Sequence, residues 1–182
     1  MSIQEKAEQF AKQRHIGMTR DGGKPYLTHL EGIVNRLKKI GVNDEDLLAA
    51  GWLHDIIEDT DTTFDDINSI FGKNVAVLVL SLTKDKKLSK KELKRQYIEQ
   101  IKNAPWQAQL IKLCDIASNL KSLKDSNWSK NKIKNQVKEK RYYLDTIKPG
   151  LVQIKPKFPS ILGIIDDINK VLLEHEQRQV TI

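Results

Sequence analysis

The chain has 182 residues, a net charge of +7 and 39% hydrophobic residues, which fits one folded domain with a substantial core. Its longest apolar run, residues 75–82, is far too short to cross a bilayer, and the N-terminus lacks the basic-then-apolar pattern of a secretory signal. The single cysteine, Cys114, excludes an intrachain disulfide, so we expect a packed thiol in a cytoplasmic protein.

Helix caps and breakers predict helices along almost the whole chain. No run with strand periodicity lies between hairpin turns, so VAVLVLSL (75–82) is assigned to a helix despite its β-branched residues. The predicted fold class is therefore all-α. In chain order, helices are predicted at 2–14, at 25–39, from 43 or 44 through the segment 51–61, and at 63–72, 74–82, 89–102, from 105 through 115, 129–147 and 159–177.

The segment GWLHDIIEDTD (51–61) is the most informative part of the chain. On a continuous helix, residues four apart share a face, so His54 would align with Glu58 and Asp55 with Asp59. Imidazole nitrogens and carboxylate oxygens together suit Mn, Fe or Zn, and the second carboxylate pair could handle a proton or a metal-bound water. The alternative is an amphipathic helix with a solvated acidic face.

The rest of the chain favours the metal site. Residues 44–66 contain nine Asp or Glu and no Lys or Arg, and a bound cation would relieve the repulsion within this acidic segment. Asp115 lies in an otherwise mostly apolar helix, where an unpaired carboxylate would be costly, and Asn119 shares its face. His29, at the head of a periodic helix, is a further candidate ligand or a simple helix-start residue.

The order of His29, the His54–Asp55 pair and Asp115 resembles the HD superfamily of metal-dependent phosphohydrolases. Three strings resemble the alarmone-hydrolase domain of the RelA/SpoT family, especially its small stand-alone members, and the similarity covers about residues 5–150. These strings are FAKQRHIGMTRDGGKPYLTH (10–29), LLAAGWLHDIIEDTDTTFDDINSIFGKNVAVLVLSLTKDKK (47–87) and IKLCDIASNLKSL (111–123). The resemblance implies a single compact HD-domain helical bundle.

The resemblance also implies an activity: hydrolysis of the 3′-pyrophosphate of guanosine tetra- or pentaphosphate, with one Mn²⁺ as cofactor. By matching position, the metal ligands are His29, His54, Asp55 and Asp115, and the catalytic acid–base residues are Glu58 and Asp59. The same matching assigns nucleotide contacts to Arg20, stacked on the base, and to Asn119, Lys121, Ser122 and Tyr143.

Two basic stretches indicate an anionic partner or solvated faces. Residues 84–95 carry seven basic and two acidic side chains, and residues 121–141 carry eight and two. A nucleic-acid groove would require aromatic residues spaced for base stacking, and the chain is only 6% aromatic. A small phosphorylated nucleotide is therefore the expected partner, rather than a nucleic acid or a membrane.

The chain departs from the family pattern at Asp21, where a basic residue is usual, and at Ile116–Ser118, where a basic and a bulky residue are common. Both changes concern the nucleotide pocket, so an HD phosphohydrolase acting on another phosphorylated nucleotide or nucleotide cofactor is the alternative. A metal-stabilised binding module without catalysis is a third reading, which the presence of Glu58 and Asp59 disfavours. We expect the phosphohydrolase domain at 1–150 and a C-terminal helical extension at 151–182, packed on that domain or contacting a homo-oligomer partner.

Overall fold

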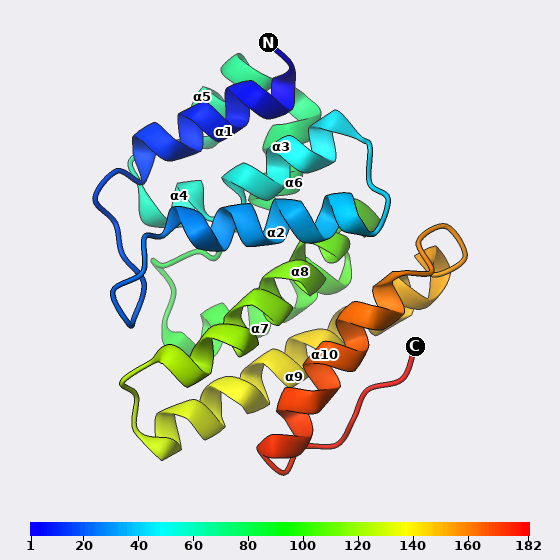
Figure 1. Ribbon diagram of the computed structural model, residues 1–182. Coiled ribbons are helices and arrows are strands. Elements are labelled where there is room, and N and C mark those ends of the chain that lie inside the picture. Colours follow the sequence, from blue (N-terminus) through cyan, green and yellow to red (C-terminus); the bar gives the residue numbers. More distant parts are fainter.

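The computed structural model describes residues 1–182 and contains ten α-helices, one short 3-10 helix and no β-strand, which confirms the all-α prediction. Figure 1 shows the helices packed into one bundle. In chain order they are α1 (Ile3–Arg14), α2 (Leu27–Lys39), α3 (Glu45–Leu53), α4 (Ile56–Asp59), α5 (Phe64–Phe71), α6 (Lys73–Leu80), α7 (Lys90–Lys102), α8 (Trp106–Ser122), η1 (Leu123–Asp125), α9 (Lys130–Ile154) and α10 (Ile161–Glu174).

Helix α8 lies at the centre of the bundle. Its residues from Ala108 to Ser118 are all buried, as expected for a helix that is apolar on almost every face. It packs against α2, α3 and α6 on one side and against α9 and α10 on the other (Figure 1). The polar side chains between Ala108 and Ser118, among them Asp115, are therefore buried in the interior.

Local sequence explains where several helices begin. Capping boxes start α1 at Ser2, α5 at Thr63 and α7 at Ser89, and the Asp44 side chain caps α3 by accepting from the Leu47 backbone N–H. The run 75–82 forms α6, so its assignment to a helix is confirmed up to Leu80.

Helices α2 and α3 approach each other closely at Gly51. A Cβ atom at this position would lie 3.0 Å from Leu37 Cδ1 and 3.3 Å from Val34 Cγ2. The lack of a side chain at Gly51 therefore lets α3 pack tightly against α2. This contact places the end of α3, and the residues that follow it, beside the first turn of α2.

The prediction of one continuous helix through the segment 51–61 is wrong. Helix α3 ends at Leu53, and α4 is a single turn that begins at Ile56. Between them Asp55 has φ −104° and ψ −1°, the sparsely populated bridge region, where many active-site residues lie. His54 Nδ1 lies 3.0 Å from the Gly51 carbonyl oxygen, so this side chain, instead of a backbone N–H, satisfies a carbonyl at the end of α3. The Asp59 N–H still donates to the Asp55 carbonyl at 3.0 Å, so these two residues stay one turn apart despite the break.

Helix α9 also differs from its prediction, because it continues past Pro149 to Ile154 instead of ending near residue 147. Proline removes one helical hydrogen bond, but buried Leu151 and Ile154 keep the helix packed beyond it. At Gly150 a Cβ atom would lie only 1.7 Å from Gln109 Oε1 on α8. This close approach holds α9 against α8 at the point where the sequence suggests an end.

Residue 150 therefore lies inside α9, and the last helix, α10, packs on α8. The tail after α10 is held by Asn169, which donates to the Val180 carbonyl at 2.9 Å and accepts from the Val180 N–H at 2.8 Å. None of the helices combines the length and apolar character needed to span a membrane.

Candidate metal centre and active site

The four predicted metal ligands come together from three parts of the chain: α2, the α3–α4 junction and α8. His54 Nε2 lies 2.9 Å from Asp55 Oδ2 and 3.9 Å from Asp115 Oδ1. His29 Nε2 lies 3.7 Å from Asp55 Oδ2 and 3.4 Å from Asp115 Oδ1. Ligand atoms of His29, His54 and Asp55 thus lie within 4.8 Å of one another, and Asp115 adjoins both imidazoles.

The His54 imidazole is oriented as a metal ligand. It is buried, and its Nδ1 lies 3.0 Å from the Gly51 carbonyl oxygen, which can only accept, so Nδ1 carries a proton. Its Nε2 is buried and faces two carboxylate oxygens, Asp55 Oδ2 at 2.9 Å and Asp115 Oδ1 at 3.9 Å. Burial lowers the pKa of His54, but the carboxylates of Asp55 and Asp115 outweigh it and raise this pKa to about 9. The surroundings therefore favour a cation at this nitrogen.

Asp55 is held by Tyr26, whose hydroxyl donates to Asp55 Oδ2 at 2.6 Å. The Tyr26 ring in turn stacks on the His15 ring, with centroids 4.9 Å apart and an interplanar angle of 3°. Burial raises the pKa of Asp55, whereas His54 and His29 lower it, and the net result is well below the usual range. Asp55 is therefore an oriented carboxylate anion.

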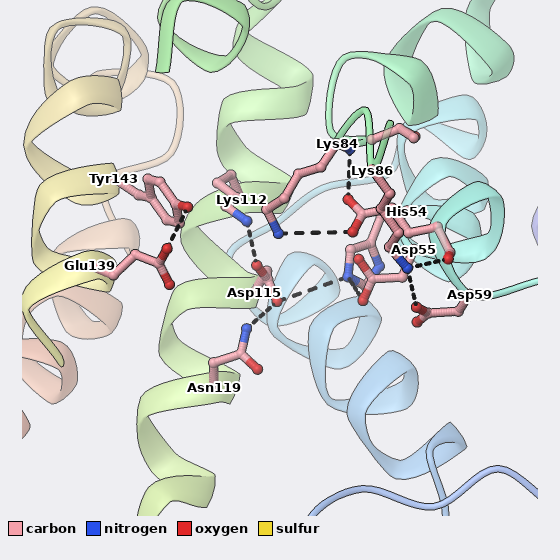
Figure 2. Close-up of polar contacts among 12 residues, drawn as sticks. His54, Asp55, Asp59, Lys84, Lys86, Lys112, Asp115, Asn119, Glu139 and Tyr143 are labelled. Atoms are coloured by element: carbon pink, nitrogen blue, oxygen red, sulfur yellow. Dashed lines mark hydrogen bonds and ion pairs between the residues drawn. The ribbon is translucent and has the colours of Figure 1, made fainter. Parts of the chain in front are cut away.

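Asp115 is held in the same way from its own helix. Its Oδ2 accepts from Lys112 Nζ at 2.8 Å and its Oδ1 accepts from Asn119 Nδ2 at 2.6 Å. Figure 2 shows Lys112 and Asn119 on either side of Asp115 along α8, with His54 and Asp55 facing it. Burial raises the pKa of Asp115, but Lys112 and His29 lower it well below the usual range. The free lone pairs of Oδ1 thus point to the two histidines.

We call the four candidate ligands, His29, His54, Asp55 and Asp115, the metal cluster. His29 connects this cluster to Arg20. Its Nδ1 lies 2.8 Å from Arg20 Nη1 and 3.0 Å from Ser118 Oγ. Because a guanidinium only donates, Nδ1 accepts from Arg20 in this arrangement, and the ring proton is on Nε2. Coordination of a metal through Nε2 requires the other tautomer, in which Nδ1–H donates to Ser118. The Ser118 hydroxyl oxygen is already within hydrogen-bond distance to accept from Nδ1–H in that tautomer.

Glu58 and Asp59 follow the His–Asp pair in α4, and both face lysines of the segment after α6. Glu58 Oε1 accepts from the Lys84 backbone N–H at 2.8 Å, and Asp59 Oδ1 lies 3.6 Å from Lys86 Nζ. Lys86 also donates to the Glu58 carbonyl. Burial raises the pKa of Glu58, against the opposing effect of Lys84. The Glu58 carboxylate therefore binds a proton more tightly than the side chain of an ordinary glutamate does.

A small pocket with a cavity volume of about 60 Å³, partly open to solvent, lies beside the metal cluster. Arg20 bridges the two regions, because its Nη2 donates to Asn119 Oδ1 at 2.5 Å while its Nη1 contacts His29. The lining residues are Arg20, Asp21, Asn119, Ser122, Leu123, Ser126, Trp128, Gln136 and Lys140.

Three of the five predicted nucleotide contacts, Arg20, Asn119 and Ser122, line this pocket, whereas Lys121 and Tyr143 do not. Lys121 is exposed on α8. Tyr143 is buried, its hydroxyl donates to Glu139 Oε1 at 3.0 Å, and its ring centroid lies 5.2 Å from Lys112 Nζ. Tyr143 therefore contacts the lysine that holds Asp115.

The sequence analysis missed several residues that complete the site. Lys112 had a usable signal, because it is one of the few charged residues in the apolar α8 and lies one turn before Asp115. The others, Tyr26, Trp128, Gln136 and Lys140, reach the site through packing between helices distant in sequence. The buried thiol expected at Cys114 is confirmed, and burial raises its pKa to about 12.

Comparison with known proteins agrees with this architecture. The family model described as "HD domain" matches residues 7–141, which is most of the chain. The chain therefore belongs to the HD domain family of proteins.

Its relatives include enzymes named guanosine-3′,5′-bis(diphosphate) 3′-pyrophosphohydrolase MESH1. The protein from Danio rerio is 38% identical over 131 residues, covering 70% of this chain and 71% of the relative, and that from Homo sapiens is 38% identical over 133 residues, covering 70% and 74%. A solved structure of a metazoan orthologue of SpoT, described as hydrolysing ppGpp, superposes with a TM-score of 0.83 at 26% identity and covers 96% of each chain. The expected relationship to small stand-alone members of the RelA/SpoT family is confirmed.

Proposed function

We propose that this protein is a metal-dependent hydrolase that removes the 3′-pyrophosphate of guanosine tetra- or pentaphosphate. The observation that carries the proposal is the convergence of His29, His54, Asp55 and Asp115 beside a pocket that Arg20 and Lys140 line. The relatives named 3′-pyrophosphohydrolases share more than a third of their aligned residues with this chain, which supports the same reaction.

The same four residues would hold one divalent metal, for which we propose Mn²⁺. The donor set fits: ligand atoms of His29, His54 and Asp55 lie within 4.8 Å of one another, Asp115 Oδ1 lies 3.4 and 3.9 Å from the two imidazoles, and the two carboxylates would balance the charge of a divalent ion. When bound, such an ion polarises a phosphoryl oxygen and lowers the pKa of a bound water. Tyr26 and Lys112 would keep the two carboxylates oriented during the reaction.

The chain's own residues supply the acid–base chemistry in this proposal. The oxygen of a water molecule attacks the phosphorus bonded to the 3′ oxygen of the ribose, and the bond from that phosphorus to the 3′ oxygen breaks. Glu58, with Asp59 beside it, accepts a proton from the water and passes a proton to the 3′ oxygen as it leaves. The products are pyrophosphate and guanosine di- or triphosphate.

The pocket would hold the rest of the nucleotide. We propose that Arg20 stacks on the base and that Asn119 and Ser122 contact sugar or phosphate, since all three line the pocket. Contacts from Lys121 and Tyr143 stay predictions from the resemblance, because neither side chain lines the pocket. Asp21 also lines it, and its negative charge favours the alternative substrate, another phosphorylated nucleotide or nucleotide cofactor.

Two further expectations belong to this proposal. Residues 1–150 would form the phosphohydrolase domain, with residues 151–182 as an extension packed on it or contacting a second copy. The proposed location is the cytoplasm, in keeping with a single buried cysteine that forms no disulfide.

The test is to incubate the purified protein and Mn²⁺ with a panel of phosphorylated nucleotides and to identify the products. We expect pyrophosphate and guanosine diphosphate from guanosine tetraphosphate, and no turnover after chelation. Rapid cleavage of another nucleotide, with guanosine tetraphosphate left intact, would support the alternative substrate instead.

A further inference from the structure

Lys140 on α9 is a largely buried ammonium group without a close anionic partner. Its side chain is 13% exposed, and the only carboxylate oxygen within 4 Å of Nζ is Glu139 Oε2 at 3.7 Å, longer than a hydrogen bond. The Tyr143 ring lies beneath it at 5.5 Å. A buried charge with so little compensation is costly, and proteins keep such groups mainly where they have a task.

Lysines as well as carboxylates surround Lys140. Burial and the nearby ammonium groups of Lys112 and Lys84 lower the pKa of Lys140, and Asp115 and Glu139 offset this only in part. Lys112 itself is already paired with Asp115 at 2.8 Å. Lys84 lies 3.9 Å from Glu58 and Lys140 lies 3.7 Å from Glu139, so among these lysines only Lys112 has a carboxylate at hydrogen-bond distance, and Lys140 keeps its N–H donors for an incoming anion.

Lys140 also lines the pocket that begins at the metal cluster. Two further donors line the same pocket, the Arg20 guanidinium and the amide of Gln136 one turn before Lys140 on α9, together with the Ser122 and Ser126 hydroxyls, which donate to the Asn119 and Leu123 carbonyls. A cation with several neutral donors around a cavity is the arrangement that binds phosphate oxygens through charge-assisted hydrogen bonds. Asp21 is the single acidic residue of the lining.

We propose that Lys140 binds a phosphoryl group of the pyrophosphate unit, both in the substrate and in the released product. This assignment rests on the proposed function and names the residue that recognises the leaving pyrophosphate. Lys140, and not the exposed Lys121, is then the lysine that reads phosphate in this pocket. The bound anion compensates the charge that α9 places there.

The test measures binding of inorganic pyrophosphate by calorimetry, with the protein supplied with one equivalent of Mn²⁺. Replacing Lys140 by Met keeps the length of the side chain and removes its charge, so we expect pyrophosphate to bind roughly 10- to 100-fold more weakly, the usual effect of losing a charge-assisted hydrogen bond. Affinity for guanosine diphosphate should change much less. K140R should retain pyrophosphate binding within a few-fold, because it keeps a cationic donor.

Two controls separate this role from a structural one. Lys138→Met removes an exposed charge from the same helix and should leave pyrophosphate binding unchanged. In the absence of any ligand, K140M should melt about 2–4 °C higher than the wild type, because an uncompensated buried charge is gone. Unchanged pyrophosphate affinity in K140M, or a lower Tm with equal loss in K140R, would overturn the proposal.

The outcome is also distinguishable from failure of the proposed function. If the wild type cleaves no guanosine tetraphosphate, yet binds pyrophosphate in a manner that depends on Lys140, then the anion site stands and only the substrate is wrong. If the wild type cleaves guanosine tetraphosphate and K140M releases pyrophosphate with unchanged affinity, then the reaction stands and the role of Lys140 is refuted.

Discussion

The metal cluster and the neighbouring pocket are built in different ways. A hydrogen-bond donor orients each carboxylate of the cluster. The Tyr26 hydroxyl, just before α2, holds Asp55, and Lys112 Nζ on α8 holds Asp115. The pocket is lined instead by the loop around Arg20, the end of α8, the segment around Trp128 and one face of α9. The first region is rigid and buried, whereas the second is open and formed largely by connecting segments.

This difference separates chemistry from recognition. A metal site requires a fixed donor geometry, which buried helices with internal hydrogen bonds provide. Substrate choice depends on pocket walls, and loops can change these walls without disturbing the core. The departures from the family pattern fit this division, because Asp21 lies in the pocket lining while all four candidate ligands keep their positions.

The largest effect is expected from Asp115→Ala, which tests whether the cluster acts as one unit. The substitution removes a ligand oxygen close to both histidines, so we expect loss of bound metal and of turnover, at least about 10³-fold. Elemental analysis measures the bound metal, and the rate of pyrophosphate release measures turnover. Asp125→Ala, which removes a surface carboxylate paired with Lys24, is the matched control and should behave as the wild type. Retention of both metal and activity in D115A would show that the metal centre lies elsewhere.

The second prediction separates acid–base chemistry from binding within the rigid region. Glu58→Gln should lower kcat by roughly 10²–10⁴-fold while metal and nucleotide affinity stay within a few-fold. Burial raises the pKa of Glu58, and a general base must be ionised, so activity should fall as the pH is lowered through this raised pKa. The Gln variant should lack that acidic limb in its pH–rate profile. An equal loss of metal binding would make Glu58 structural; Asp59→Asn is the companion variant.

The four candidate ligands stand out in the sequence because they belong to short local patterns, and the structure brings them close together. The His54–Asp55 pair is adjacent in the chain, and Asp115 stands out as a carboxylate in an apolar helix. The caps at Ser2, Thr63 and Ser89 similarly predict helix starts, since capping depends on residues within one turn.

The remaining features depend on contacts between distant segments. The break after α3 follows from the contacts of His54 and Asp55, and α9 continues past Pro149 because Gly150 packs against Gln109. Lys140 reaches the pocket only because α9 lies against α8, and it looks like any other lysine of a basic stretch. Tertiary packing overrides local signals in each case.

A third prediction concerns the contacts that support the ligands. Lys112→Met leaves Asp115 buried without its cation, so the free energy of unfolding without metal should fall by about 3–5 kcal/mol. Added Mn²⁺ should recover more stability in this variant than in the wild type, because the ion replaces the lost charge. Turnover should drop roughly 10- to 100-fold. Lys102→Met removes an exposed lysine charge from α7, so this control should change neither quantity. If added Mn²⁺ stabilises K112M no more than the wild type, Lys112 does not support the metal ligand Asp115 as proposed.

The smallest effect is expected at Arg20, where the two regions meet. Its guanidinium contacts His29 and Asn119 and also lines the pocket, so it could serve either the metal or the nucleotide. If it stacks on the base, Arg20→Ala should raise KM for guanosine tetraphosphate by about tenfold and change kcat little, since stacking acts before and during the chemical step. A simple phosphate ester without a base should be hydrolysed at the wild-type rate. Metal affinity should not fall, because Ser118 remains as the acceptor for His29 Nδ1–H. A lower kcat for both substrates, with weaker metal binding, would place Arg20 with the metal cluster and erase the boundary between the two regions.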